Sequence, residues 1–251
     1  MKKLFVVGIG PGDAQYLTPQ ARQALNQSQH VVGYSLYVDL LAPVLAQHQC
    51  HRFAIGEEQQ RVDHSLKLAL QGEITSLVSS GDAGIYAMAS LLLETLQLNY
   101  PDGQPSLAIE FIPGISAMQV LASRVGAPLG HDFCVISLSD LLTPWSVIEQ
   151  RLHSAGSGDF ICVLYNPASR QRRHPLEQAQ HILLQYRHPD TPVALGKNLS
   201  RPGEKIIITT LKLLDFSTVD MLTVLIIGNS QTRNYAPWLY TPRGYTHDGN
   251  E

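Results

Sequence analysis

The stretch Ser79-Ser80-Gly81-Asp82-Ala83-Gly84-Ile85-Tyr86 is the point from which the fold can be inferred. An apolar run, 74–78, precedes it with the β-branching of a buried strand, and residues 86–96 follow with a helical pattern. The stretch is therefore predicted to be a strand-to-helix turn, where open α/β sheets bind ligands. Gly81 and Gly84 would let the backbone approach a bound molecule closely.

Asp82 has two interpretations. Its carboxylate is able to accept hydrogen bonds from an amine or hydroxyl of a ligand, or it caps the helix that follows while Gly81 serves as an ordinary turn glycine. These residues alone leave both interpretations open.

Two further turns follow predicted strands. Residues 8–13, Gly-Ile-Gly-Pro-Gly-Asp, resemble the dinucleotide fingerprint but carry Asp13 in place of its third glycine. An acidic side chain repels phosphate, so this turn suits a neutral or cationic ligand, or is only a tight turn. Residues 113–117, Pro-Gly-Ile-Ser-Ala, place Ser116 either as a helix N-cap or against the polar edge of a small ligand.

Composition limits the partners. The 251 residues carry a formal charge of −3, with a pI near 6.3 and no polybasic run, so neither nucleic acid nor a membrane surface is an expected partner. Cys50, Cys134 and Cys162 lack paired spacing, which indicates a reduced, cytoplasmic protein without a Cys₄ metal or iron–sulfur site. His48-Gln49-Cys50-His51 is predicted to be surface loop, and no metal site is expected. Residues 1–8 are predicted to form a first strand rather than a signal peptide.

Strand and helix patterns alternate along the chain. They predict an α/β fold of two α/β domains with mostly parallel or mixed sheets. The predicted domains are residues 1–126 and 127–245, followed by a polar tail, 246–251. The second series has predicted strands at 134–138, 159–165, 191–196, 205–209 and 223–227.

Three motifs, in this order, resemble those of the tetrapyrrole methyltransferase superfamily. They are Gly8-Ile9-Gly10-Pro11-Gly12 with Leu17-Thr18, then Ser80-Gly81-Asp82, then Pro113-Gly114-Ile115-Ser116-Ala117. A second set of stretches resembles one branch of that superfamily, the C17-methyltransferases of cobalamin biosynthesis, which act on precorrin-3B or cobalt-factor III. This set comprises residues 79–86, 126–133, 137–145, 165–167 with 169–170, and 241–245.

The resemblance implies a fold, a cofactor and a site. The family fold consists of two α/β domains with the active site in the cleft between them, usually in a homodimer. The implied cofactor is S-adenosyl-L-methionine, which leaves as S-adenosyl-L-homocysteine, and the implied partner is a tetrapyrrole. By matching position, the cofactor-binding residues would be Pro11, Ser80, Gly81, Asp82, Ile85, Ser116, Ala117, Tyr165, Asn166 and Leu199.

The same resemblance implies methyl transfer to C17 with contraction of the macrocycle. Ring contraction requires a base that takes a proton from an oxygen at C20, and His131 or Asp132 is the candidate for that catalytic role. The alternative is structural: Asp132 caps or forms an ion pair, and His131 packs at the domain joint.

Arginines are candidate partners for the carboxylates of such a substrate. Arg170 and Arg243 lie inside branch motifs and are the preferred candidates, and the alternative is a solvated basic face. Other functions remain open at this level. They are a tetrapyrrole methyltransferase of different regiochemistry, a methyltransferase of this fold acting on RNA or protein, and a non-catalytic module that binds a tetrapyrrole or nucleotide.

Overall fold

The chain divides into two compact units. The computed structural model describes residues 2–103, 105–168 and 174–245, and its contacts separate Met1–Ala117 (unit 1) from Met118–Glu251 (unit 2). The sequence places the boundary after residue 126, whereas the structure assigns 118–126 to unit 2. Helix α5 (Ala117–Val125) belongs there because Arg124 pairs with Glu204, with Nε and Oε1 3.0 Å apart.

Unit 1 is built on a five-stranded parallel sheet with the strand order β3-β2-β4-β1-β5. Its strands are β1 (Lys3–Gly8), β2 (His30–Tyr34), β3 (Gln49–Phe53), β4 (Thr75–Ser79) and β5 (Ala108–Ile112). Because all five strands run the same way, the turns that follow β1, β4 and β5 emerge at one edge of the sheet.

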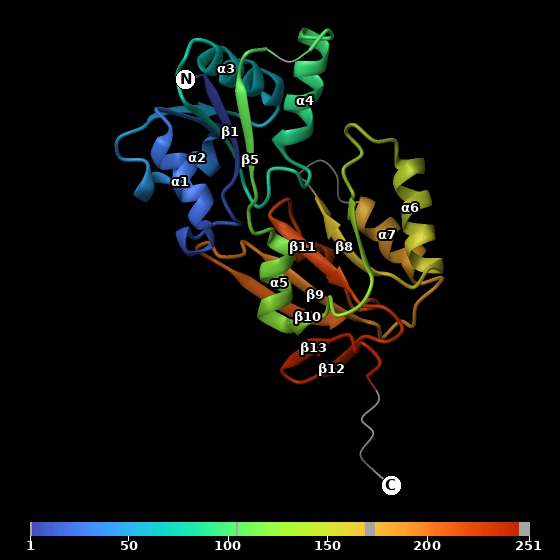
Figure 1. Cartoon of the computed structure of the whole chain (residues 1–251). Helices are drawn as coiled ribbons and strands as arrows, with labels where there is room; N and C mark the ends of the chain where they lie inside the picture. The colour runs from blue at the N-terminus through green and yellow to red at the C-terminus, as the bar shows by residue number, and fades with distance from the viewer. Residues whose placement is uncertain (1, 104, 169–173, 246–251) are drawn as a thin grey trace. The chain divides into compact units, whose positions relative to one another are not determined.

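Helices cover both faces of this sheet (Figure 1). They are α1 (Pro19–Gln27), α2 (Ser35–Leu40), α3 (Glu58–Leu70) and α4 (Met88–Asn99), with short 3₁₀ turns at Ala14–Tyr16 and Ala42–Val44. Successive strand side chains point to opposite faces. Leu4 and Val6 therefore pack with α3 and α4, while Phe5 and Val7 pack with α1 and α2.

Local sequence features explain several element ends. Thr18 caps α1 by accepting a hydrogen bond from the N–H of Ala21 at 3.1 Å, and Pro19 follows at the first helical position. The loop prediction for residues 48–51 is wrong: β3 begins at Gln49 and pairs with β2, with Cys50 opposite Val31. Pairing with a buried neighbour outweighs the polar composition of this strand.

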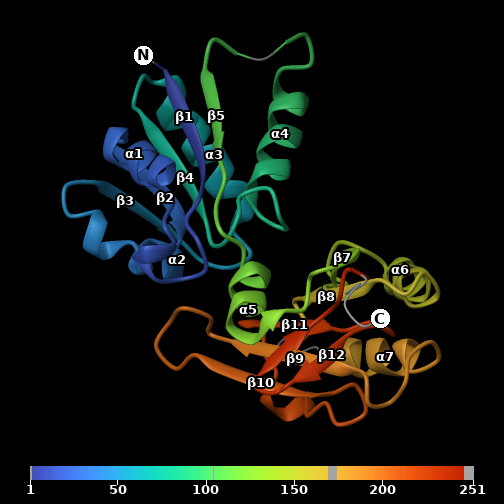
Figure 2. The same ribbon diagram turned by 60° about the horizontal axis from the view of Figure 1, so that its bottom comes forward.

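Unit 2 contains a mixed five-stranded sheet with the order β10-β9-β11-β8-β7 (Figure 2). Its strands are β7 (Phe133–Ser137), β8 (Ile161–Tyr165), β9 (Pro192–Lys197), β10 (Lys205–Thr210) and β11 (Thr223–Ile227). Only β7 and β8 are parallel neighbours, and the other pairs are antiparallel. Helices α6 (Trp145–Ser157) and α7 (His174–Leu183) pack against one face through the largest apolar cluster of this unit. The predicted α/β class with parallel and mixed sheets is confirmed.

A second, small sheet completes unit 2. It joins β12 (Arg233–Tyr235), β13 (Trp238–Tyr240) and β6 (Gly126–Ala127), and a 3₁₀ turn lies at Phe216–Thr218. Thr241 fastens the end of β13, because its Oγ1 donates to the carbonyl of Pro128 at 2.8 Å. Tyr235 and Trp238 are 72% and 50% exposed, so this hairpin presents aromatic side chains to solvent.

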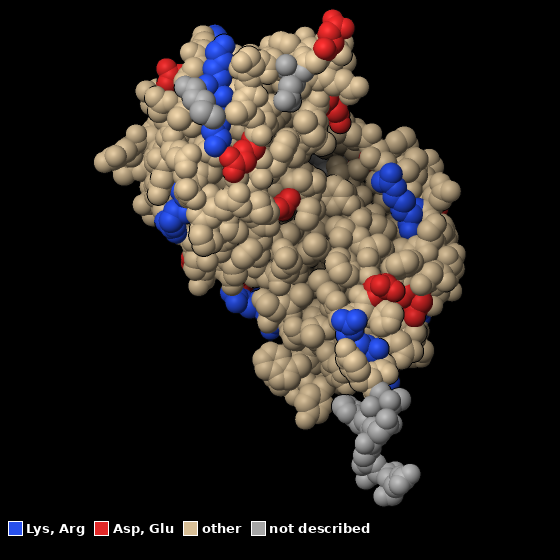
Figure 3. Space-filling model, in the orientation of Figure 1, with Lys and Arg blue, Asp and Glu red and all other residues tan. Residues whose placement is uncertain are grey.

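Charged side chains are scattered on the surface. Lysine, arginine, aspartate and glutamate occur in small groups on the face shown in Figure 3, without an extended basic strip among the described residues there. Over the part of the chain that the structure describes, no helix combines the length and apolar character needed to cross a membrane.

Candidate functional site

Three turns meet at the carboxyl edge of the sheet of unit 1. After β1 and β4, Gly10 and Gly81 exchange backbone hydrogen bonds: the N–H of Gly81 donates to the carbonyl of Gly10 at 2.8 Å, and the reverse bond is 3.1 Å. The Ser80 hydroxyl also donates to the Gly10 carbonyl, at 3.4 Å. The turn that contains the predicted cofactor residues is thereby fixed to the Gly-Pro turn near the N-terminus.

The third turn lies so close to the other two that only glycine fits at the contact. A Cβ atom on Gly114 would lie 2.0 Å from the carbonyl oxygen of Gly81, and one on Gly8 would lie 2.7 Å from the nitrogen of Gly114. Real Cβ atoms are not found at such distances from backbone. These glycines are therefore required by the packing of backbone on backbone.

The Asp82 carboxylate holds the turns at the carboxyl edge of this sheet together. Its Oδ1 accepts from the N–H of Gly84 at 2.8 Å, and its Oδ2 accepts from the N–H of Gly114 at 2.9 Å. Helix α4 begins at Met88 with Ala87 as its N-cap, so the interpretation of Asp82 as the cap of that helix is wrong. The carboxylate orders two turns from different parts of the sequence.

The structure brings together the predicted cofactor residues of unit 1. Gly81, at a φ of +69°, lies against Ser116, since a Cβ built on it would be 3.6 Å from the Ser116 Cα. Pro11 and Ser116 are buried, and Ile85 is half-buried. All the residues predicted from this half of the chain lie on the three turns: Pro11, Ser80, Gly81, Asp82, Ile85, Ser116 and Ala117.

The chemistry of these turns suits a ligand without phosphate. Residues 8–13, 79–87 and 113–117 include Asp13 and Asp82 but no lysine or arginine. The Asp13 carboxylate accepts from the N–H of Gln15 at 2.8 Å and caps the 3₁₀ turn. Backbone groups and carboxylates fit a cationic, amine-bearing ligand better than a pyrophosphate. Among the described residues, no group of three or more His, Cys, Asp or Glu side chains is placed to hold a metal ion.

Tyr165 and Asn166 lie at the carboxyl end of β8 in unit 2. The Tyr165 hydroxyl accepts a hydrogen bond from the N–H of Met118, in the first turn of α5, at 3.0 Å. Asn166 has a φ of +52°, and its Nδ2 donates to the Ser137 hydroxyl at 3.0 Å. Ser137 ends β7, so the ends of these two parallel strands are joined by side chains.

Leu199 turns its side chain into the core. It is buried, and its Cδ2 would lie 2.8 Å from a Cβ on Gly196. Its neighbours Asn198 and Ser200 both have positive φ, at 52° and 55°. A ligand contact at this position would therefore involve the backbone and not the Leu199 side chain.

His131 and Asp132 are not brought to the Tyr165 end of the sheet. They precede β7, whereas Tyr165 and Asn166 follow the parallel neighbour β8, so the two pairs mark opposite edges. Both side chains are exposed, and His131 Nδ1 accepts from the N–H of Asp132 at 2.8 Å. The Asp132 carbonyl accepts from the N–H of Ile161, which starts β8. The contact of 3.7 Å between His131 Nδ1 and Asp132 Oδ2 fits the structural alternative for Asp132, whereas the exposed His131 side chain is not packed as that alternative expects.

Of the two arginines predicted to bind substrate carboxylates, the structure describes only Arg243. Arg170 lies outside the described residues. Arg243 is exposed and follows Thr241, which is hydrogen-bonded to the segment 127–128. It therefore lies near the chain that leads to His131, and no described contact places it beside Tyr165 or Asn166.

Sequence reasoning overlooked two residues at the carboxyl edge of β7. The Ser137 hydroxyl accepts from Asn166 and from the N–H of Ser139, the latter at 3.3 Å. Asp140 follows in the same loop and is exposed. Their position directly after a predicted strand of the parallel pair was the feature that could have identified them.

The comparison with protein families decides the family. The model for tetrapyrrole (corrin/porphyrin) methylases matches residues 3–215. The chain belongs to this family. The match extends from β1 to the residue before the 3₁₀ turn at Phe216–Thr218. It therefore covers the whole sheet of unit 1 and every strand except β11 of the five-stranded sheet of unit 2 in this methylase.

Curated relatives of this methylase are similar over almost its whole length. It is 43% identical over 243 residues to a cobalt-factor III methyltransferase of Priestia megaterium, and 42% identical over 243 residues to a probable cobalt-factor III C(17)-methyltransferase of Salmonella typhimurium. Both alignments cover 97% of the chain. The chain spans about half (45%) of the length of the Priestia protein but 99% of the Salmonella protein.

Solved structures agree with this assignment. The crystal structure of the methyltransferase CobJ superimposes with a TM-score of 0.90 at 37% identity, covering 96% of this chain and all of that one. A uroporphyrin-III C-methyl transferase from Thermus thermophilus, complexed with S-adenosyl homocysteine, has a TM-score of 0.65 at 20% identity, covering 90% of this chain and 97% of that one. The second likeness shows a shared fold only.

Proposed function

We propose that this methylase transfers a methyl group from S-adenosyl-L-methionine to C17 of precorrin-3B or cobalt-factor III. The same enzyme would contract the ring, giving precorrin-4 or its cobalt form in cobalamin biosynthesis. The similarity to the Salmonella protein, 42% over 97% of this chain and 99% of that one, is the observation that carries the proposal. The likeness to CobJ supports it independently through the fold.

The three turns of unit 1 are proposed to hold the cofactor. Their backbone groups and the Asp82 carboxylate offer what a sulfonium with an amino-acid end requires, and they lack the cations that a phosphate would need. A protein of the same fold was solved with S-adenosyl homocysteine. Tyr165, Asn166 and the backbone at Leu199 are proposed to complete the set. When bound, S-adenosylmethionine supplies an electrophilic methyl group.

The contribution of the protein to methyl transfer is proposed to be positional. An enzyme that holds a nucleophilic carbon in line with the methyl group converts a bimolecular reaction into an effectively intramolecular one. This positioning can supply a large part of the decrease in the activation free energy. The rigid edge formed by Gly10, Gly81 and Gly114 fits this task, since each turn is fixed to another by backbone contact. Fixed backbone dipoles would also accommodate the loss of positive charge.

Ring contraction requires a proton acceptor, and Asp140 is proposed in place of His131 or Asp132. Asp140 follows β7 at the edge where Tyr165 and Asn166 end β8. His131 and Asp132 lie at the other edge of these strands. A carboxylate is a competent general base when it reaches the oxygen that loses its proton.

The substrate carboxylates are proposed to be bound by arginine side chains. Arg243 is exposed on a segment that Thr241 fastens in place, so its guanidinium is accessible to an anion. Arg170 is retained from the sequence as the second candidate.

We also propose that the protein is a cytoplasmic homodimer. The exposed aromatic side chains of the β12–β13 hairpin favour association, and all three cysteines are free thiols. Sedimentation of the purified protein would test the oligomeric state.

The test of function is a single incubation. The purified protein is mixed with cobalt-factor III, or with precorrin-3B, and S-adenosylmethionine labelled with ¹³C in its methyl group, and the product carbons are assigned by NMR. Label at C17 of a contracted ring is the expected result. Label on another carbon would establish different regiochemistry, and tight binding of the tetrapyrrole without transfer of label would make the protein a binding module.

A further inference from the structure

Two cysteines face each other across neighbouring parallel strands of unit 2. Cys134 on β7 is the register partner of Cys162 on β8, and their Sγ atoms are 3.8 Å apart. Neighbouring strands lie about 4.8 Å apart, so the Cα–Cα separation falls within the range that a disulfide spans. The two thiols need only a small side-chain movement to become bonded.

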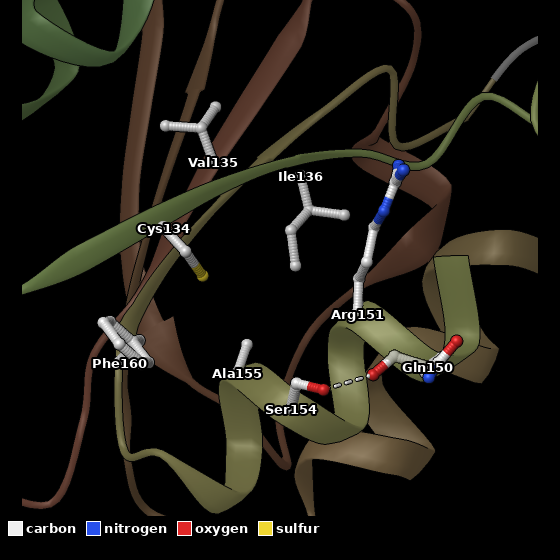
Figure 4. Close-up of a pocket in the computed structure, with 8 residues that line it drawn as sticks. All are labelled: Cys134, Val135, Ile136, Gln150, Arg151, Ser154, Ala155 and Phe160. Atoms are coloured by element: carbon white, nitrogen blue, oxygen red, sulfur yellow. Dashed lines mark hydrogen bonds between the residues drawn. The ribbon is translucent and has the colours of Figure 1, made fainter. Parts of the chain in front are cut away.

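The two thiols differ in access. Cys162 is fully buried, whereas Cys134 is half-buried and lines a cavity of about 470 Å³ between β7 and α6. Figure 4 shows the Cys134 sulfur pointing toward Ala155 on α6, with Phe160 and Ile136 on either side. A small uncharged molecule that enters this cavity therefore meets Cys134 and not Cys162.

A buried cation lies next to the pair. The Arg187 side chain is 1% exposed, and its Nη2 donates to the Cys162 Sγ at 3.4 Å. The same guanidinium donates to the carbonyls of Gly228 and Phe160, which hold it in place. Its nearest carboxylate in the described chain is that of Asp159, with Nη1 and Oδ1 3.9 Å apart. Its positive charge therefore favours one negative charge on the two sulfur atoms.

Ionisation of the pair follows from these contacts. The hydrogen bond with Cys162 lowers the pKa of Cys134, and the charge of Arg187 lowers it further. The same hydrogen bond and burial raise the pKa of Cys162, which keeps its proton. Of the two thiols, the accessible Cys134 is therefore the one whose ionisation is favoured, and Cys162 is the one that keeps its proton, the arrangement that thiol oxidation uses.

We propose that Cys134 and Cys162 form a peroxide-reactive dithiol, in which hydrogen peroxide or a small organic hydroperoxide enters this cavity and oxidises Cys134. Cys162 then resolves the product as a disulfide between β7 and β8. Ser137 and Tyr165 end the same two strands, so the new bond would restrain the edge at which Asn166 contacts Ser137.

The chemistry balances in two steps. The Cys134 thiolate attacks one peroxide oxygen, the O–O bond breaks, and the other oxygen leaves as hydroxide or alkoxide, which takes up a proton. The sulfur is then a sulfenic acid, oxidised by two electrons while the peroxide is reduced. The Cys162 thiol attacks that sulfur, an S–S bond forms, the S–OH bond breaks, and the hydroxyl leaves with the Cys162 proton as water.

Cys50 provides a control within the same chain. It lies on β3 in unit 1, its Sγ is 3.8 Å from the carbonyl of His48, and burial raises the pKa of its thiol. Neither of the other two cysteines belongs to that unit. It should therefore remain a thiol under conditions that oxidise the pair.

The experiment treats the full-length protein with hydrogen peroxide, quenches it with an alkylating agent in denaturant, and maps the peptides by mass spectrometry. In wild-type protein we expect a cross-linked Cys134–Cys162 peptide that lacks two hydrogen atoms and is reversed by a dithiol reductant. In Cys162→Ser we expect a dimedone adduct on Cys134 without a cross-link, and in Cys134→Ser we expect neither. Iodoacetamide should modify native Cys134 about ten times faster than Cys50.

Two outcomes would overturn the proposal. One is oxidation of Cys50 at a rate equal to or above that of Cys134. The other is the absence of both the cross-link and a dimedone adduct from Cys134 while the cysteines of the unfolded protein react normally. Circular dichroism of both serine variants separates a chemical effect from loss of folding, and Cys50→Ser should oxidise at the wild-type rate.

Discussion

The carboxylate of Asp82 joins two turns that are remote in sequence: its Oδ2 accepts from the backbone N–H of Gly114 at 2.9 Å while its Oδ1 accepts from Gly84 at 2.8 Å. Both oxygens therefore have protein partners before any ligand arrives. Asp82 therefore shapes the edge of the sheet, and under the proposed function the backbone groups that it arranges would recognise the cofactor.

Asp82→Asn is expected to weaken binding of S-adenosylhomocysteine. In the asparagine side chain, an NH₂ group replaces one carboxylate oxygen of Asp82 and faces a backbone N–H, to which it cannot bond. One charge-assisted hydrogen bond, worth about 1.5–3 kcal/mol, is therefore lost. If the turn loses its bound shape, the dissociation constant rises roughly 10- to 100-fold. Titration calorimetry of the two proteins measures the change.

Asp102→Asn is the matched control for this variant, since Asp102 is exposed in a loop of the same unit. It should bind the cofactor product as wild type does. Unchanged affinity in Asp82→Asn, at an unchanged urea midpoint, would exclude Asp82 from the site.

Gly114→Ala is expected to destabilise unit 1 and abolish cofactor binding. The added methyl would lie 2.0 Å from the Gly81 carbonyl, and neither backbone segment can move without breaking the Gly10–Gly81 hydrogen bonds. Overpacking of this kind costs about 1–3 kcal/mol. Urea unfolding should show the loss. Gly84→Ala meets only the Asp82 Oδ1 at 3.2 Å and should lose much less stability; equal losses would contradict the explanation.

Much of the fold could be predicted from sequence because strands, caps and turns are local. The predicted strands 74–78 and 223–227 match β4 and β11, since each depends on a few neighbouring residues. The meeting of the three Gly-bearing turns could be predicted for the same reason, since parallel strands carry their turns to one edge, and their role as a cofactor site stays a prediction.

The wrong loop prediction for residues 48–51 has a different origin. β3 is polar and becomes a strand only because β2 lies beside it, which no local pattern encodes. The catalytic role of His131 or Asp132 stays a prediction: both residues precede β7, at the edge opposite to Tyr165 and Asn166. The direction of a strand decides at which edge of the sheet the residues before it and after it lie. The sequence motif around His131 does not contain β8, so it does not show that residues before β7 and residues after β8 lie at opposite edges.

Tyr165→Phe is expected to lower stability by about 1 kcal/mol, because the hydroxyl is an acceptor for the N–H of Met118 at 3.0 Å. The loss should be accompanied by weaker cofactor binding if the start of α5 belongs to the site. Tyr186→Phe is the control in the same unit, since the described contact of its hydroxyl is with the half-buried ring of His153, at 2.9 Å from Nδ1. Urea titration and calorimetry of both variants provide the comparison. Equal effects of the two substitutions would show that the Met118 contact has no special role.

Three histidines form a hydrogen-bonded chain across β2, β3 and α3. His30 Nδ1 lies 2.9 Å from His51 Nε2, and His51 Nδ1 lies 3.0 Å from His64 Nε2. Each of the two hydrogen bonds between the rings holds one proton. The three neutral rings can therefore bind one additional proton with both hydrogen bonds intact, whereas binding of a second additional proton must break one of them. Burial, more than any neighbouring charge, lowers the pKa values of His51 and His64, with Lys67 lowering that of His64 further. Glu73 lies 3.7 Å from the far side of His30.

Acid is therefore expected to destabilise the protein. A cationic group whose pKa is lower in the folded state binds fewer protons there than in the unfolded chain, so the stability is fully present above about pH 6.5 and is lost as pH falls below it. The urea concentration at the midpoint of unfolding should therefore decrease as the pH is lowered from about 7.5 to about 5. His51→Gln should show a smaller fall, whereas His188→Gln, at an exposed position, should behave as wild type. An identical pH dependence in His51→Gln would refute the explanation.

Asp140→Asn is expected to separate methyl transfer from ring contraction. Asp140 follows β7 at the edge where β8 ends, so loss of its basicity should lower the rate of contraction by about 10²–10⁴-fold while C17 is still methylated. His131→Ala should retain contraction, because that side chain is exposed at the opposite edge. Product analysis by NMR distinguishes a methylated, uncontracted ring from precorrin-4 or its cobalt form. Full contraction by Asp140→Asn together with its loss in His131→Ala would return the catalytic role to the histidine and require that its edge meet the substrate.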